Sequence, residues 1–146
     1  MGFRFTLASV LRVRESIERR EELALQRVEL EIARVQRRIE QLSEEMEKAT
    51  AAREKELQQP IPAYRVREIQ EQLNAALEEK QAMLAALQVA QKQRDAQRKR
   101  YQDAHKGRKM LTEMRVQQKD LYEQEEVRAQ QKQLDDIFTS RHQRGN

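Results

Sequence analysis

The sequence predicts an all-α protein in which two helices of unequal length form a long antiparallel two-helix coiled coil. The 146 residues are 37% charged and 4% aromatic, and no tryptophan is present. A mean hydropathy of −1.03 leaves too little apolar side chain for a globular core. Such a chain is either disordered or built of long helices that bury a narrow stripe. A three/four spacing of apolar residues favours helices, and one pair of prolines divides them.

The first helix is expected over about residues 5–58, a stretch without proline or glycine. Its apolar residues alternate at spacings of three and four for about four heptads, which is typical of a coiled-coil seam. The residues between them are mostly Arg, Glu and Gln, which favour helices and face solvent. Upstream, Leu7, Val10 or Leu11, Ile17 and Ala24 continue the stripe after a slip in phase. The expected seam consists of Leu25, Val28, Ile32, Val35, Ile39, Leu42, Met46 and Ala49.

The hinge is expected at residues 59–63, where Pro60 and Pro62 interrupt the pattern. A proline cannot continue a helix interior, and it drives the preceding residue toward extended geometry. Because the two prolines separate two heptad patterns, they indicate a turn within one coiled-coil domain spanning 1–146.

The second helix is expected over about residues 64–139, followed by a flexible tail at 140–146. Past Ala90 its apolar stripe thins, and Gly107 would cost about 1 kcal/mol relative to alanine inside a helix. A short hinge makes the helices antiparallel, which places residues n and 121−n side by side. The second helix then extends from about residue 117 past the start of the first, with nothing in its own chain to cover it.

Charge is distributed unevenly over this predicted hairpin. Residues 92–119 carry ten basic and three acidic side chains, and the opposing residues 2–29 carry six and five. The half near the termini is therefore basic, whereas the hinge half and the last 27 residues are each slightly acidic. An acidic protein surface fits such an end better than nucleic acid does, because the stretch has only Tyr101 as a stacking aromatic and belongs to no DNA-reading fold.

No catalytic, cofactor-binding or metal-binding motif is recognisable in the sequence. It has no glycine-rich phosphate loop, no zinc-ligand spacing and no cysteine. His105 and His142 lie among charges and are interpreted as solvated, as are the clustered carboxylates Glu123, Glu125 and Glu126. The absence of a long apolar run and of a signal sequence indicates a cytoplasmic protein.

Motifs near both ends resemble those of a known family. The opening FRFTLASVLRVR, at 3–14, is followed near the end by RKMLTEMR at 108–115 and KQLDDIF at 132–138. With the coiled coil and broken hinge between them, they are similar to the bacterial flagellar export protein family FliJ. The resemblance covers nearly the whole chain, although its coiled-coil middle is not specific.

The resemblance implies a non-enzymatic part of the flagellar type III export apparatus, needed for motility and located in the cytoplasm at the inner membrane. Members are similar to the gamma stalk of rotary ATPases; they bind the hexameric export ATPase (FliI) and the export gate protein (FlhA), and help cycle export chaperones. The end with both termini would enter the ATPase ring, through Leu7, Leu11, Arg14, Arg108, Leu111 and Arg115. The gate contact would lie at Ile69, Leu73 and Ala76, with Lys80 at the next step of that stripe.

The residues alone leave other interpretations open. The stripe of Ile69, Leu73 and Ala76 is most simply the seam that faces the first helix, although Leu77, Leu84 and Leu87 are also available for that seam. The chain could instead be a structural coiled coil that dimerises through its overhang, a rotary-ATPase stalk outside flagella, or a nucleic-acid-binding hairpin.

Overall fold

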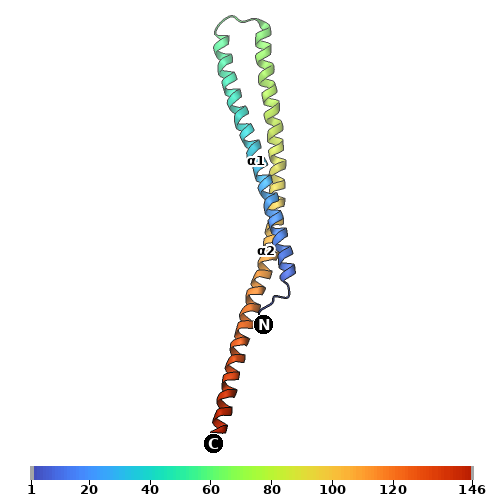
Figure 1. Ribbon diagram of the computed structural model, residues 1–146. Coiled ribbons are helices and arrows are strands. Elements are labelled where there is room, and N and C mark those ends of the chain that lie inside the picture. Colours follow the sequence, from blue (N-terminus) through green and yellow to red (C-terminus); the bar gives the residue numbers. More distant parts are fainter. Residues whose placement is uncertain (1, 146) are drawn as a thin grey trace. The chain divides into compact units, whose positions relative to one another are not determined.

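The fold consists of two α-helices joined by a short turn, as expected. The structure is a computed structural model that describes residues 2–145. Helix α1 spans Ala8–Leu57, and the longer helix α2 spans Ala63–Arg144 (Figure 1). The described residues contain no strand. No helix among them combines the length and apolar character that a membrane crossing requires.

Local hydrogen bonds mark the residues at which α1 and α2 begin. Before α1, the amide of Ala8 donates to the carbonyl of Phe5 at 3.1 Å, so a turn occupies the first residues of the helix expected from residue 5. After the turn, the carbonyl of Pro62 accepts from the amide of Arg65 at 3.1 Å. Pro62 lacks an amide hydrogen, so its position directly before the helix leaves no donor unpaired.

Helix α2 continues to Arg144, five residues beyond its expected end at residue 139. No proline or glycine lies between Thr139 and Gly145, and Arg141, His142 and Arg144 place basic side chains at the negative end of the helix dipole. Thr139 and Ser140 donate their hydroxyls to carbonyls one turn back, each at 2.8 Å. Local signals at the end of the chain therefore favour helix where its polar composition suggested a tail.

Residues Glu21–Tyr101 form one compact unit, in which α1 and α2 run antiparallel on either side of the turn. All eight residues of the expected α1 seam are buried or half-buried, and Leu42 is only 1% exposed. From α2, Ile69 and Ala90 are buried against them. Ion pairs flank this seam, with Arg38 on Glu79 at 2.8 Å and Arg65 on Glu56 at 3.1 Å.

A second compact unit joins the start of the chain, through Arg20, to residues from Gln102 onward. Phe5, Leu11 and Ala104 form its buried core, and Leu11 rather than Val10 faces α2. Phe3 packs on Tyr122 with 5.7 Å between ring centroids. Within each unit the expected register holds: Arg65 pairs with Glu56, and Gly107 lies against Arg14, both satisfying the relation of n with 121−n.

Candidate partner-binding surfaces

Two of the three family-like motifs, FRFTLASVLRVR at 3–14 and RKMLTEMR at 108–115, lie together at one end of the second unit and are called the two terminal motifs below. Phe3, Phe5, Ala8 and Leu11 come from the first motif, and Arg115 comes from the second. With Arg12 and Glu15 they line a hollow of about 240 Å³. Phe5 and Leu11 are buried while Arg12, Glu15 and Arg115 are exposed, so the hollow has an apolar wall and a rim that carries two cations and one carboxylate. Such a site suits a partner side chain that has an apolar body and a negative or polar end.

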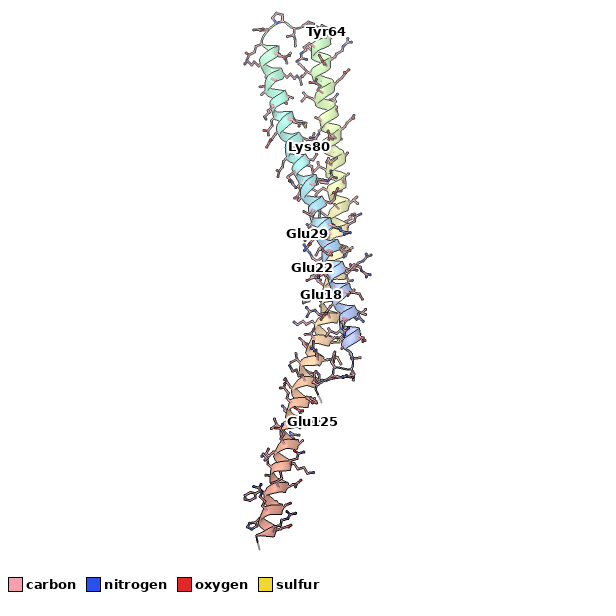
Figure 2. The ribbon with its side chains drawn as sticks, viewed as in Figure 1. Glu18, Glu22, Glu29, Tyr64, Lys80 and Glu125 are labelled. Carbon is pink, nitrogen blue, oxygen red and sulfur yellow. The ribbon has the colours of Figure 1, made fainter. Side chains whose placement is uncertain are left out.

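Glu18 lies on α1 (labelled in Figure 2) and forms an ion pair with Arg108 of α2. Arg108 donates through Nε to Oε2 of Glu18 at 2.5 Å and through Nη2 to Oε1 at 3.3 Å. His105 Nδ1 lies 3.2 Å from the same Oε1. The side chain of Glu18 is 16% exposed and that of Arg108 is 25% exposed. The Arg108 hydrogen bond lowers the pKa of Glu18 below its usual value, burial opposes it, and His105 adds a smaller lowering.

This arrangement corrects one expectation from the sequence. His105 was interpreted as solvated, yet it is half-buried and, like Arg108, engages Glu18. A sequence window around residue 105 contains few carboxylates, and the partner comes from a residue nearly ninety positions earlier. Only the antiparallel register places it there, so the local composition could not reveal it.

The other residues expected to contact an ATPase are distributed around the same end. Leu7 and Leu111 are half-buried, and Arg14 is exposed, with its guanidinium beside Gly107. Of the six expected residues, Leu11 and Arg115 therefore share the hollow, and Arg108 belongs to the Glu18 cluster.

The residues expected to contact an export gate lie on α2 in the first unit, and all face the seam. Ile69 is 7% exposed, while Leu73 and Ala76 are half-buried. Beside them, Leu77 and Leu84 are each 43% exposed, and Leu87 is half-buried. The apolar surface left uncovered here is thus the edge marked by Leu77 and Leu84. Lys80 is half-buried and borders a shallow groove that α1 residues 43–54 line.

Several residues of the terminal end were not predicted from the sequence to belong to a binding surface. Phe3, Phe5 and Arg12 appear there only as parts of a motif, and Glu18 and Tyr122 lie in no recognisable motif. The relation of n with 121−n, applied to the FRF opening, pairs it with residues near 118 and so offered a signal for an aromatic contact. Tyr122 also donates its hydroxyl to Glu126 at 2.9 Å, which raises the pKa of the tyrosine.

The carboxylates Glu123, Glu125 and Glu126 remain exposed on a single helix. Across residues 2–145, no three His, Asp or Glu side chains converge in an arrangement suited to a metal ion.

A family model described as flagellar FliJ protein matches residues 3–146. This chain belongs to the FliJ family. It is therefore a component of the flagellar export apparatus, and the family is a structural constituent of the flagellar system. Neither a curated protein nor a solved structure gave a match to the sequence. The family match includes both terminal motifs, which the second unit brings into contact.

Proposed function

We propose that this chain is a non-enzymatic, stalk-like subunit that binds the ring of the export ATPase FliI through the end where its two terminal motifs meet. In this proposal it acts in the cytoplasm at the base of the flagellum, contacts the gate protein FlhA near the start of α2, and helps to escort export chaperones. The observation that carries the proposal is the hollow between the FRF opening and Arg115. It brings together two motifs that both lie within the family match.

The basic character of this end supports an ATPase contact. Arg12 and Arg115 border the hollow, and Lys106, Lys109 and Lys119 are exposed on the same stretch of α2. Exposed cations of this kind steer association with an acidic surface and make it depend on salt. The buried Phe5 and Leu11 fix the shape of the apolar wall, so that a partner meets a preformed surface.

Substitution of Arg115 tests the ATPase contact. Arg115 is exposed, so Arg115→Glu reverses the charge of one of the two cations at the rim without disturbing the seam. We expect the affinity for the FliI hexamer to fall at least about tenfold, with a weaker salt dependence. Arg37→Glu makes the same charge change at an exposed α1 position outside this end and should bind normally. Equal affinities for the two variants in a titration at physiological salt would place the ATPase contact elsewhere.

The effect on nucleotide hydrolysis gives a second measurement on the same proteins. The purified chain should hydrolyse no ATP by itself, and its addition should change the hydrolysis rate or oligomeric state of FliI. Arg115→Glu should reduce that change, and Arg37→Glu should preserve it. Hydrolysis that persists in the purified chain through repeated chromatography would contradict the non-enzymatic assignment.

For the gate, we propose that Ile69, Leu73 and Ala76 shape a surface whose exposed edge is Leu77. Because Ile69 is buried in the seam, replacing it would disturb the hairpin as well as any contact. Leu77→Glu avoids this, and it should reduce capture of FlhA. Leu23→Glu is the matched control, since Leu23 is 46% exposed on α1 of the same unit. FlhA capture that is equal for the two variants would remove this edge from the contact.

A further inference from the structure

The end of α2 carries apolar side chains that nothing in the described chain covers. Every described residue from Glu123 onward is exposed. Val127 is 61% exposed, Leu134 66%, Ile137 51% and Phe138 74%. In Figure 2, Glu125 marks this part of α2, where side chains project outward from a single helix. A lone helix gains little stability without tertiary packing, so these residues favour a helical partner.

Val127, Leu134 and Ile137 belong to a heptad pattern separate from the seam with α1, and Phe138 lies next to it. Its positions are 120, 123, 127, 130, 134, 137, 141 and 144, at alternating spacings of three and four. Tyr122 marks the side of α2 that meets the start of the chain, through its contact with Phe3. Val127 lies five residues later, which is about 140° around the helix at 3.6 residues per turn. A helix packed on this face would therefore not compete with the start of the chain for space.

The charges on this face are ordered along the helix. The first two heptad positions are Asp120 and Glu123, and the last two are Arg141 and Arg144. Val127, Leu134 and Ile137 lie between these acidic and basic ends. The charges of the face are thus complementary to those of a second copy that runs in the reverse direction.

Two copies in antiparallel register, with residue n opposite 264−n, satisfy this complementarity. Asp120 then meets Arg144 of the second copy, Glu123 meets its Arg141, and Val127 meets its Ile137. The face has two alternating sets of positions: 120, 127, 134 and 141 form one set, and 123, 130, 137 and 144 form the other. Each layer pairs a residue of one set with a residue of the other set, as antiparallel coiled coils require. Parallel pairing would instead place Glu123 beside Glu123 and Arg141 beside Arg141, which like-charge repulsion disfavours.

We propose that residues 120–144 form an antiparallel homodimer, in which this face of α2 packs on the same face of a second copy. The contact is isologous, so each ion pair and each apolar layer occurs twice around a two-fold axis near Lys132. A shallow hollow bounded by Asp136, Ile137, Ser140, Arg141 and Arg144 lies beside this face and would receive Glu123 of the second copy. The inference is independent of the ATPase contact, which involves the other motifs.

Sedimentation of the full chain tests the dimer. We expect the mass to rise from the 17.4 kDa monomer toward twice that value over a series up to about 100 μM, because association depends on concentration. Leu134→Asp should keep the protein monomeric throughout. Circular dichroism on the same samples should show that α1 and most of α2 remain helical. A wild-type protein that stays monomeric over the series would overturn the proposal.

Charge exchange tests the register. Glu123→Arg and Arg141→Glu should each weaken dimerisation at least about tenfold by creating like-charge layers, and the double variant should restore it. Glu125→Arg is the matched control: it makes the same charge change on the opposite side of the segment and should dimerise like the wild type. Failure of the double variant to recover, or an equal loss with Glu125→Arg, would overturn the proposed interface.

The direction of pairing has a separate measurement. Because the chain has no cysteine, Gln143→Cys carries a single spin label at a unique, exposed site. In the antiparallel dimer the labels on the two copies should be about 35 Å apart, since residue 143 lies opposite residue 121. A parallel dimer would bring them within about 20 Å, and that distance would overturn the proposal.

Discussion

At the scale of the residue, Glu18 links the two helices of the terminal end through its side chain. It accepts from Arg108 and contacts His105, and its side chain is only 16% exposed. We expect Arg108→Glu to lower the free energy of unfolding by about 1 to 3 kcal/mol, because it sets two carboxylates against each other. Thermal melting should show the loss, and Glu18→Arg with Arg108→Glu should recover much of it. Melting unchanged by the single variant would mean that the Glu18–Arg108 pair does not contribute to stability.

The same carboxylate should make stability depend on pH. Its pKa is lowered in the folded protein from the usual 4.5, chiefly by Arg108. Between the two values the unfolded chain binds a proton that the folded chain does not, so stability falls as pH falls below about 4.5. Above that pH the contribution is fully present. Urea unfolding at a series of pH values should therefore show a wild-type advantage over Glu18→Gln that disappears in acid, whereas exposed Glu22→Gln should show no such advantage.

Gly107 offers the opposite kind of change, one that should stabilise the protein. A helical Gly costs about 1 kcal/mol relative to Ala. A methyl group here would meet the Arg14 guanidinium at 3.5 Å, an ordinary contact with the movable end of a side chain. Gly107→Ala should therefore raise the melting temperature and add up to about 1 kcal/mol of stability. A lower melting temperature would indicate that the close approach of Arg14 requires glycine.

At the scale of the element, the sequence predicts α1 better than α2. Apolar residues fill the α1 seam from Leu25 to Ala49, and all of them are buried or half-buried. The α2 seam contains Lys80, Arg94, Gln97 and Arg108, which a search for apolar periodicity passes over. Gln97, for example, is buried because its amide donates to the carbonyl of Glu21 at 3.2 Å. The apparent thinning of the stripe past Ala90 therefore marks a change from apolar to polar pairing in the seam.

The α1 seam itself can be tested with two identical substitutions. Leu42 is 1% exposed, whereas Leu30 on the same helix is 67% exposed. We expect Leu42→Ala to lower the free energy of unfolding by about 2–4 kcal/mol, through lost burial and the cavity left behind. Leu30→Ala should change it by less than about 0.5 kcal/mol. Chemical denaturation measures both, and similar losses at the two sites would contradict the observed direction of the seam.

At the scale of the whole molecule, the site is harder to predict than the fold. The turn and the register follow from the proline pair and the heptads, and they place the two terminal motifs together. Which side chains of those motifs remain exposed depends on packing across the helices, as Arg108 and Arg115 show. These two arginines lie seven residues apart in one motif, yet the first is half-buried on Glu18 and the second is exposed at the hollow.

Removing residues 123–146 should abolish self-association while leaving the stability of the hairpin almost unchanged. The described residues of this segment are all exposed, so the hairpin gains almost no buried area from them. Tyr122, which packs on Phe3, is retained. We therefore expect the melting temperature of the shortened chain to change by no more than about 2–4 °C, the equivalent of roughly 1 kcal/mol. Self-association should disappear in sedimentation, because the proposed dimer face is lost. The control without truncation is the full chain carrying Leu134→Asp, which should be monomeric like the shortened chain and melt at a similar temperature. A large fall in melting temperature on truncation alone would show that the segment packs on its own chain, and the exposed face would then need no second copy to cover it.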